Sequence, residues 1–548
     1  MRISFVDFSN FAPKNRPLHI NILPAYMDRP SRRRGKLLRR IRQTLAIVSI
    51  ILVTLLFLDF TGTVHQWFGW MARIQFLPAL LALNAGVVIA LIVLTLLFGR
   101  LYCSVICPLG IMQDGFARLG HRSKKSKYGY SKAHSALRYT MLGVMAVGVL
   151  LGVLCGVNII VELLAPYSAY GRIASTILGP LWGWGNNALA YMAERADSYA
   201  FYSTEVWLRG GLTLGIAALT LVILGFLAWK KGRLYCNTIC PVGTLLGIFS
   251  KWSLFRPVID TEKCNRCGLC ARKCKAQCID KDNHDIDMSR CVVCMDCLDN
   301  CSTGAIHYAL RRKPFAVKAG SAKSEKKSDD ARMSDAKATT DEGRRSFLAI
   351  AAGMAAAAGV QAAEKTVDGG LAEIVDKKKP QRRVRVLPPG ARSLRNLESH
   401  CTACQLCVSV CPNEVLRPST DLGSLMQPES SYERGYCRPE CTRCSEVCPT
   451  GAIIPITRAE KAFTQIGHAV WISENCLPVA DHTSCGACAR HCPAHAITMV
   501  PQEGDDRLPK IPAVDTERCI GCGACENLCP ARPFSAIYVE GNTVQRLL

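Results

Sequence analysis

The chain has 548 residues and a net charge of +24, with 67 Lys and Arg against 43 Asp and Glu. Its 30 cysteines exclude a short secreted disulfide scaffold, because closely spaced cysteine runs in a long chain indicate metal or iron–sulfur ligation. The basic residues gather beside apolar runs, as in the cytoplasmic flanks of membrane helices, so the charge does not indicate nucleic-acid binding.

A basic N-terminal segment, 1–43, precedes a membrane domain predicted over 44–257. About 20 apolar residues cross the hydrocarbon core of a bilayer. Such runs are too long and too poor in charge for the buried helices of a soluble protein. Four of them predict spans over 44–58, 76–98, 139–161 and 210–229.

Arg and Lys are concentrated in 29–42 and in 118–138, whereas 59–75 and 162–209 hold few of them. The positive-inside rule therefore predicts that the N-terminus, the 118–138 loop and the region after residue 229 are cytoplasmic.

A repeated motif closes two of the apolar runs: GRLYCSVICPLG at 99–110 and GRLYCNTICPVG at 232–243. The C-x3-C spacing places two thiols on one helix face. The two copies, Cys103 with Cys107 and Cys236 with Cys240, can supply four thiolates to a shared metal centre at the cytoplasmic boundary. Two alternatives remain: a redox-active dithiol pair, or cysteines that only pack where Gly, Arg and Pro end the helix. Matched pairs at a membrane boundary favour a functional role.

Residues 258–310 predict a ferredoxin domain with two clusters. Cys264, Cys267, Cys270 and Cys274 form a C-x2-C-x2-C-x3-C run, and Cys291, Cys294, Cys297 and Cys301 form another. In this bacterial ferredoxin run the fourth cysteine binds the other cluster, so Cys301 joins the first set and Cys274 joins the second. The Pro that usually follows the fourth cysteine is replaced by Lys275 and Ser302. Cys155, expected in the middle of the membrane, and Cys278 receive no role.

The composition of 311–342 predicts a disordered linker. Next, GRRSFLAIAAGMAAAAGVQAAE at 343–364 is similar to a twin-arginine export signal, the alternative being an Ala-rich helix behind basic residues. The segment is either cleaved near VQAA or kept as a fifth span. A spacer, 365–395, leads to a second cysteine-rich domain, 396–548.

Four further cysteine runs in 396–548 predict four [4Fe-4S] clusters. They are Cys401, Cys404, Cys407 and Cys411; Cys437, Cys441, Cys444 and Cys448; Cys476, Cys485, Cys488 and Cys492; and Cys519, Cys522, Cys525 and Cys529.

With these motifs the chain resembles two families joined end to end. Residues 36–310 resemble NapH-type membrane polyferredoxins, and 343–540, with PPGA at 388–391, resemble NapG-type (MauM/NapG) twin-arginine-exported ferredoxins. Four-cluster subunits of this kind imply that outer runs exchange their fourth cysteines, and inner runs likewise. The implied ligand sets are Cys401, Cys404, Cys407 and Cys529; Cys519, Cys522, Cys525 and Cys411; Cys437, Cys441, Cys444 and Cys492; and Cys476, Cys485, Cys488 and Cys448.

The expected architecture is an α-helical membrane bundle with four spans, and a fifth if 343–364 is kept, carrying two α+β ferredoxin-like [4Fe-4S] modules. The N-terminus and first ferredoxin domain are expected in the cytoplasm, and the exported domain in the periplasm of a bacterium with an inner membrane. Twin-arginine export fits a domain that must receive its clusters before it reaches an oxidising compartment.

The resemblance implies a quinol dehydrogenase of a periplasmic nitrate reductase-like system, with six [4Fe-4S] clusters. Electrons would pass from menaquinol or ubiquinol to a periplasmic redox protein or terminal reductase. The alternative is an electron-donating maturation or regulatory factor for a metalloenzyme, of the copper-site assembly type. Four residues near the outer boundary can handle quinol protons, although each can also be an ordinary interfacial residue: Asp59, His65, Gln75 and Glu162.

Overall fold

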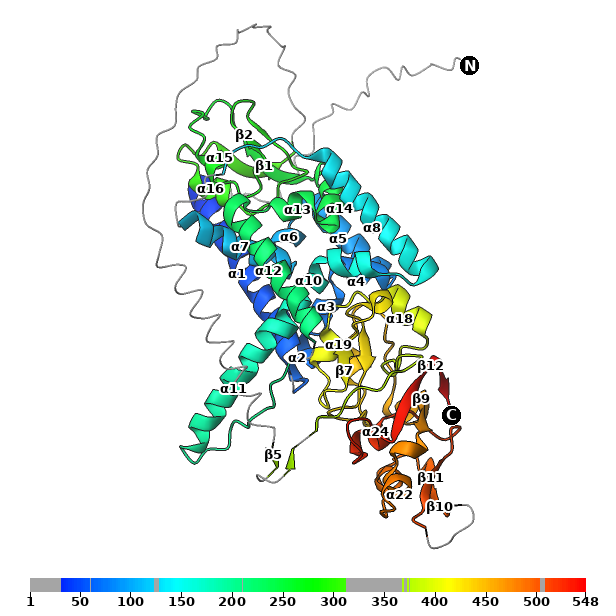
Figure 1. The fold of residues 1–548 in the computed structure, drawn as a ribbon. Coiled ribbons are helices and arrows are strands. Elements are labelled where there is room, and N and C mark those ends of the chain that lie inside the picture. The colour runs from blue at the N-terminus through cyan, green and yellow to red at the C-terminus, as the bar shows by residue number, and fades with distance from the viewer. Residues whose placement is uncertain are drawn as a thin grey trace, which may run out of the picture.

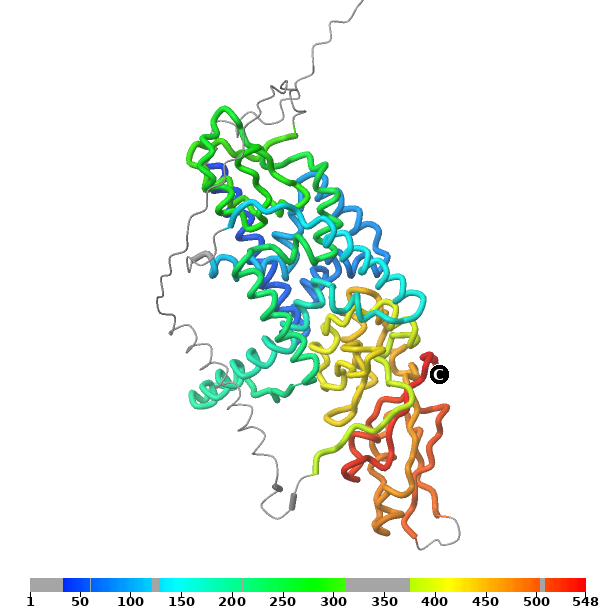
Figure 2. Tube along the Cα trace, turned by 45° about the horizontal axis from the view of Figure 1, so that its top comes forward, coloured from blue at the N-terminus to red at the C-terminus, as the bar shows by residue number. Residues whose placement is uncertain are grey.

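The computed structural model describes residues 31–59, 61–122, 128–208, 210–311, 367–368, 372–373, 375–502 and 508–548. The predicted export segment 343–364 and all but the first residue of the predicted linker lie outside these ranges. Figures 1 and 2 show a helical bundle with one small cysteine-rich domain at each end. Residues 255–311 form the domain at one end, called the two-cluster domain for its two cysteine runs, and 375–548 form the domain at the other, called the four-cluster domain for its four runs.

Three helices are long and apolar enough to cross a membrane: α1 (Ser31–Leu58), α8 (Ser135–Cys155) and α12 (Gly211–Lys231). In the apolar windows of α8 and α12 only 22% of the residues are buried inside the protein. Most apolar side chains of these two helices therefore face outwards, which suits contact with lipid rather than with water.

The predicted span 76–98 is divided between two helices and is not one continuous helix. It forms α4 (Phe76–Leu81) and α5 (Ala85–Phe98), separated by a turn in which Leu83 has a φ of 53°. The Asn84 side chain accepts a hydrogen bond from the Val87 amide at 3.3 Å and so starts a new helix. The 14 residues of α5 extend about 21 Å, which is less than the roughly 30 Å of a hydrocarbon core.

The predicted span 139–161 also differs from the structure. Helix α8 begins at Ser135 and ends at Cys155, because Gly156 takes a left-handed φ of 76° as its C-cap. A separate helix, α9 (Ile159–Leu164), follows. Cys155, expected in the middle of the membrane, is the last residue of α8 and is exposed.

The predicted outer loop 162–209 contains helices that the sequence analysis missed. They are α10 (Pro166–Ile173), a π-helix η1 (Ala174–Leu178) and α11 (Gly179–Glu194). Every residue of α10 is buried, and the helix packs against α7 (Pro108–Arg122) and α12. No long apolar run marks α10, because Ser168, Gly171 and Arg172 interrupt it.

Short helices complete the bundle: α2 (Thr63–Phe68), α3 (Trp70–Arg73), α6 (Tyr102–Val105), α13 (Leu234–Thr238) and α14 (Pro241–Ser250).

The two-cluster domain is closed by strand β1 (Phe255–Ile259), which pairs antiparallel with β4 (Ile306–Leu310). Between them lie α15 (Leu269–Lys273), β2 (Ile279–Asp280), β3 (Asp285–Ile286) and α16 (Asp296–Asn300). Arg39 of α1 lies 2.9 Å from Asp296, so this domain is attached to the start of the first long helix.

The four-cluster domain is built on strand β9 (Thr464–Trp471), which pairs antiparallel with β12 (Ile537–Leu547). Two shorter hairpins pair β7 (Leu416–Pro418) with β8 (Pro428–Ser430), and β10 (Ile497–Val500) with β11 (Ile511–Val514). A short hairpin before this domain pairs β5 (Val367–Asp368) with β6 (Ala372–Glu373). The other elements of the four-cluster domain are α18 (Leu394–His400), α19 (Leu406–Ser409), η2 (Leu422–Ser424), α20 (Arg443–Val447), α21 (Arg458–Phe463), η3 (Ser473–Asn475), α22 (Leu477–Ala480), α23 (Ala487–Arg490) and α24 (Ala524–Leu528).

Candidate metal centres

The two-cluster domain contains two cavities lined by cysteines. One is lined by Cys264, Cys267, Cys270 and Cys301, and the other by Cys274, Cys278, Cys291, Cys294 and Cys297. Each cavity combines three cysteines of one run with the last cysteine of the other. Four cysteine thiolates are the ligand set of a [4Fe-4S] cluster, so the chemistry of both cavities fits that group.

Cys278, which the sequence left without a role, belongs to the second cavity. It is 1% exposed, and its Sγ lies 3.6 Å from the Sγ of Cys274. Hydrogen bonding from Cys278 lowers the pKa of the Cys274 thiol to about 7. This cavity therefore holds a fifth thiol beside the predicted ligands.

The regularly spaced runs share a backbone conformation that explains how they surround a cavity. The residues just before and just after the middle cysteine take positive φ in all four runs with C-x2-C-x2-C spacing. These pairs are Arg266 and Gly268, Val293 and Met295, Ala403 and Gln405, and Gly521 and Gly523. Two left-handed residues bend the chain around the middle cysteine. The bends make the run a tight loop that a helix or strand could not provide.

In the four-cluster domain, the last cysteine of each run is an electrostatic neighbour of the thiols of an adjacent run, which indicates four groups. One group also lines a cavity of its own, that of Cys476, Cys485, Cys488 and Cys529. The other three groups are Cys401, Cys404, Cys407 and Cys448; Cys437, Cys441, Cys444 and Cys411; and Cys519, Cys522, Cys525 and Cys492.

This grouping differs from the exchange that the family resemblance implied. The first run exchanges its last cysteine with the second, and the third with the fourth. The resemblance implied exchange between the first and fourth runs and between the second and third. The physical reason is packing: α19 packs on α20, and α23 packs on α24. Each pair of adjacent runs therefore folds as one unit, and the last cysteine of one run reaches its immediate neighbour.

Burial raises the pKa of the Cys404 and Cys522 thiols to about 12 and that of the Cys488 thiol to about 11. Bare thiolates would be costly at such positions, whereas iron ligation stabilises the deprotonated form. Within the described ranges no three His, Cys, Asp or Glu side chains converge closely enough to hold a single bare metal ion.

The two GRLYC motifs meet inside the bundle. Cys103, Cys107, Cys236 and Cys240 are 5–6% exposed, and their thiols lie within electrostatic range of one another. The two thiols of each copy do not share one helix face as predicted. Helix α6 ends at Val105, before Cys107, and α13 ends at Thr238, before Cys240. Cys240 instead caps α14, where its Sγ accepts a hydrogen bond from the Gly243 amide at 3.4 Å.

Two arginines cross between the motif copies, and both are fully buried. Arg100 donates from Nη1 to the Gly243 carbonyl at 2.8 Å, and Arg233 donates from Nη1 to the Cys103 carbonyl at 2.6 Å. Each copy thereby holds the backbone of the other. Arg100 also donates to the carbonyl of Cys291 at 3.3 Å, which connects this site to the two-cluster domain.

Helix α10 connects the same site to the four-cluster domain. A Cβ on Gly171 would collide with the Cys404 carbonyl oxygen, so the two backbones are in direct contact there. The neighbouring Arg172 is within electrostatic range of both Tyr235 and Cys404. The membrane cysteines thus lie between the two ferredoxin domains, with α10 on the side of the larger one.

The four predicted proton-handling residues have different surroundings. Asp59 accepts hydrogen bonds from the amides of Thr61 and Gly62, and Gln75 accepts one from Tyr102. His65 Nδ1 lies 3.4 Å from Asp59.

Glu162 of α9 is 1% exposed and accepts a hydrogen bond from Gln427 of the four-cluster domain at 2.8 Å. Its second carboxylate oxygen has no partner among the described residues. Burial raises the pKa of Glu162 to about 7.

Family models match several parts of the chain. One described as a 4Fe-4S binding domain matches 81–127 and 211–259, the two segments that contain the membrane cysteines. Another 4Fe-4S binding domain matches 397–417, and a 4Fe-4S dicluster domain matches 483–532.

Three curated relatives each match part of the chain. The ferredoxin-type protein NapH of Escherichia coli is 31% identical, over 43% of this chain and 70% of the relative. The methylamine utilization ferredoxin-type protein MauM of Paracoccus denitrificans is 32% identical over 28% of this chain and 69% of the relative. MauM of Methylobacillus flagellatus is 35% identical over 24% of this chain, which spans 59% of that relative's length. No solved structure matches this chain.

Proposed function

Because the chain belongs to the family of NapH- and MauM-type polyferredoxins, we propose that it is a membrane-bound quinol dehydrogenase. It takes electrons from menaquinol or ubiquinol in the membrane and passes them to a periplasmic redox protein or terminal reductase. The broader assignment, an iron–sulfur electron-transfer protein, follows from the family and from its 4Fe-4S domains.

The observation that carries this proposal is the order of the cysteine sites through the molecule. Cys291 of the two-cluster domain is linked by Arg100 to the membrane cysteines, and α10 links those to Cys404. The described cysteine sites therefore form a continuous series between the two ends of the bundle.

Six [4Fe-4S] clusters are proposed, held by the six cysteine groups as the structure arranges them. Each bound cluster would take up and release one electron at a time. The chain itself supplies thiolate ligands, excludes water from them by burial, and fixes their order.

The membrane cysteines are proposed to hold a further metal centre. Four buried thiols drawn from two matched motifs are a sufficient ligand set, and the 4Fe-4S binding domain matches both segments. About 28 iron atoms per chain are then expected from seven four-iron groups, against about 24 from six. Iron analysis of Cys103→Ser/Cys236→Ser beside the unmodified chain measures the difference directly.

The proposed location is the inner membrane, with the two-cluster domain in the cytoplasm and the four-cluster domain in the periplasm. The basic residues that begin α1 support this orientation, because Arg39 of that helix contacts Asp296 of the two-cluster domain.

The test is anaerobic. The full chain in detergent, with oxidised clusters, is mixed with a reduced menaquinone analogue, and its paramagnetic resonance spectrum is recorded. Reduced-cluster signals with quinol alone are expected. Clusters that stay oxidised with quinol but are reduced by dithionite would contradict the proposal. That result would favour delivery of low-potential electrons to a nascent metalloenzyme.

A further inference from the structure

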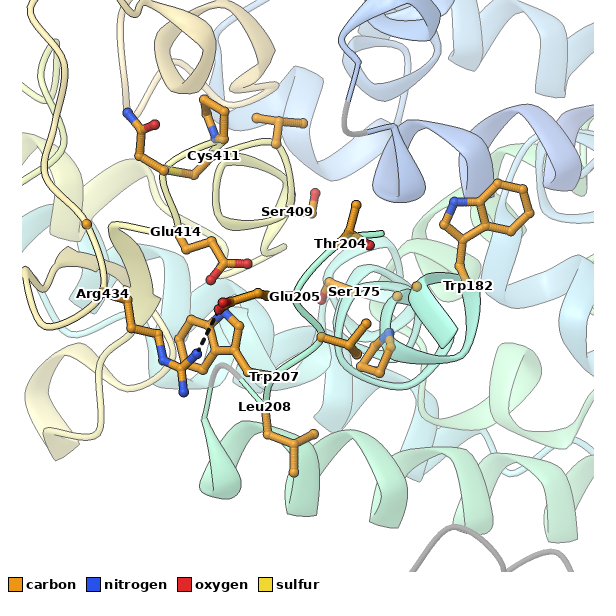
Figure 3. A pocket seen from close by; sticks show the side chains of 18 of the residues that line it. Ser175, Trp182, Thr204, Glu205, Trp207, Leu208, Ser409, Cys411, Glu414 and Arg434 are labelled. Carbon is orange, nitrogen blue, oxygen red and sulfur yellow. Dashed lines mark ion pairs between the residues drawn. The ribbon is translucent and has the colours of Figure 1, made fainter. Parts of the chain in front are cut away.

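A cavity of about 640 Å³ lies between the helical bundle and the four-cluster domain. Figure 3 shows its two walls. One wall comes from η1, α11 and residues 202, 204–208 and 210, with Ser175, Trp182 and Trp207. The other comes from the cysteine loop that contains Ser409 and Cys411. Cavities of about 300–1,000 Å³ are typical of small-molecule and cofactor sites.

The cavity lies where two long helices reach the same end of the bundle. Phe57 and Leu58, the last residues of α1, line it, and so does Leu214 in the first turn of α12. Trp182, Tyr202 and Leu208 also line it and are 49%, 63% and 53% exposed. Trp and Tyr are typical of the membrane–water interface. The rim therefore offers an apolar entrance at the depth where lipid meets the outer domain.

The polar groups of the bundle wall include several hydrogen-bond acceptors and one donor, the buried Trp207 Nε1, which has no partner among the described residues. The hydroxyls of Ser175 and Thr176 donate to the Arg172 carbonyl at 3.3 and 2.6 Å, and the Thr204 hydroxyl donates to Asn187 at 3.3 Å. Their protons are therefore engaged, while their oxygen lone pairs can accept. The carboxylates of Glu205 and Glu414 add further acceptors. A ligand with two hydroxyl donors on an apolar ring complements this lining.

The opposite wall contains an iron–sulfur ligand. Cys411, grouped with Cys437 and Cys444, lines the cavity together with Pro412 and Asn413. The ion pair between Arg434 Nη1 and Glu205 Oε2, at 3.6 Å, joins the two walls (Figure 3). A molecule in this cavity would therefore touch the ligand shell of one cluster, the one that Cys411 helps to hold.

We propose that this cavity is the quinol-binding site, and that it receives the reduced headgroup with the isoprenoid tail leaving past Leu208. The inference rests on the proposed function. Oxidation breaks the two O–H bonds of the quinol, and both protons leave by way of Glu205 and Glu414 to the outer solvent. The two electrons leave one at a time for oxidised [4Fe-4S] groups, beginning with the one that Cys411 helps to hold.

Two glycines of α11 provide a matched test. Gly179 lines the cavity, and a Cβ there would meet only the Ala174 carbonyl oxygen, at 3.8 Å. Gly185 is on the same helix, lies outside the cavity lining, and has nothing within 4 Å of such a Cβ. Replacing either glycine by Leu raises helix propensity by a similar amount. Gly179→Leu places a side chain in the cavity lining and Gly185→Leu does not.

The probe is 2-heptyl-4-hydroxyquinoline N-oxide, a quinol analogue whose fluorescence is quenched on binding. With the full chain in detergent, Gly179→Leu is expected to weaken binding at least tenfold, and Gly185→Leu to leave it unchanged. Iron content and the dithionite-reduced spectrum should be the same in both variants and in the unmodified chain. A photoreactive azidoquinone should label peptides within 175–186, 202–210 or 409–414.

The outcomes separate this inference from the proposed function. If quinol reduces the clusters of Gly179→Leu as well as those of the unmodified chain, with unchanged probe binding, the cavity is not the site and the function stands. If label maps to the cavity but quinol never reduces the clusters, the cavity binds quinol and the dehydrogenase function is wrong. If neither the probe nor the label binds, the inference is overturned.

Discussion

At the residue scale, Glu162 is the side chain whose surroundings most depend on the fold. It lies on a short helix of the bundle, yet its hydrogen-bond partner Gln427 belongs to the four-cluster domain, 265 residues later. The sequence marked it only as an acid near a predicted span. Its burial could not be read from the sequence, because the burying surface comes from a separate domain.

Glu162 also gives the protein a pH-dependent stability. Its pKa is raised from 4.5 to about 7, so the folded state keeps a proton that the unfolded state has lost at intermediate pH. Stability from this group is present below the unfolded pKa and is lost as pH rises towards 7. Between pH 5.5 and 7 the free energy of unfolding should fall by about 2 kcal/mol because of this group. Glu162→Gln should remove this dependence in thermal unfolding, whereas Glu194→Gln, at an exposed position, should retain it.

At the element scale, the spacing of cysteines along the sequence predicts some features of the structure, and the packing of helices determines others. Cysteine spacing located every run, and it indicated that the GRLYC copies act together. Spacing did not reveal that 76–98 breaks at Asn84, because hydropathy counts apolar residues and not the caps that end a helix. Spacing also gave no sign of α10. The fourth cysteines of the four-cluster domain were assigned by resemblance, whereas the packing of α19 on α20 determines which run each of them reaches.

The crossed arginines predict an asymmetry between the two motif copies. Arg233 donates from Nε to Asp114 Oδ1 at 2.9 Å, whereas Arg100 donates to carbonyls and to Asn237. Arg233→Gln removes one of three cations around the buried Asp114 carboxylate, the others being Arg42 at 2.9 Å and Lys275 at 3.6 Å, so the loss should stay below the roughly 3–5 kcal/mol of a fully unpaired buried charge. Thermal unfolding should show a larger loss for Arg233→Gln than for Arg100→Gln. Lys230→Gln, at an exposed position three residues earlier, serves as the control; equal losses for both arginines would contradict the prediction.

At the scale of the whole molecule, the two ferredoxin domains contact opposite ends of α1. Arg39 near its start contacts Asp296, and Thr61, just past its end, accepts a hydrogen bond from Arg443 at 3.1 Å. If α1 crosses the membrane, the two domains are on different sides of it. The four-cluster domain then needs its own route across, which is the role predicted for 343–364.

The Arg pair of that segment can be tested by export. Arg344→Lys with Arg345→Lys should keep the four-cluster domain in the cytoplasm, because the twin-arginine route depends on both residues. Protease added to spheroplasts should digest the domain in the unmodified chain and spare it in the variant. Arg311→Lys with Arg312→Lys is the matched control. Digestion of the domain in the twin-lysine variant would show that another route exports it.

The contacts between the bundle and the four-cluster domain have a consequence for the order of assembly. Asn158 donates to the Cys401 carbonyl at 3.4 Å, Arg73 donates to that of Glu446 at 2.9 Å, and Glu162 is buried by Gln427. If the four-cluster domain is exported folded and loaded with iron, as proposed, helices that enter the membrane during synthesis must wait for it. Until it docks, these polar side chains would remain uncovered at the outer surface. The lifetime of the half-assembled protein would then depend on how fast the cell supplies iron–sulfur clusters.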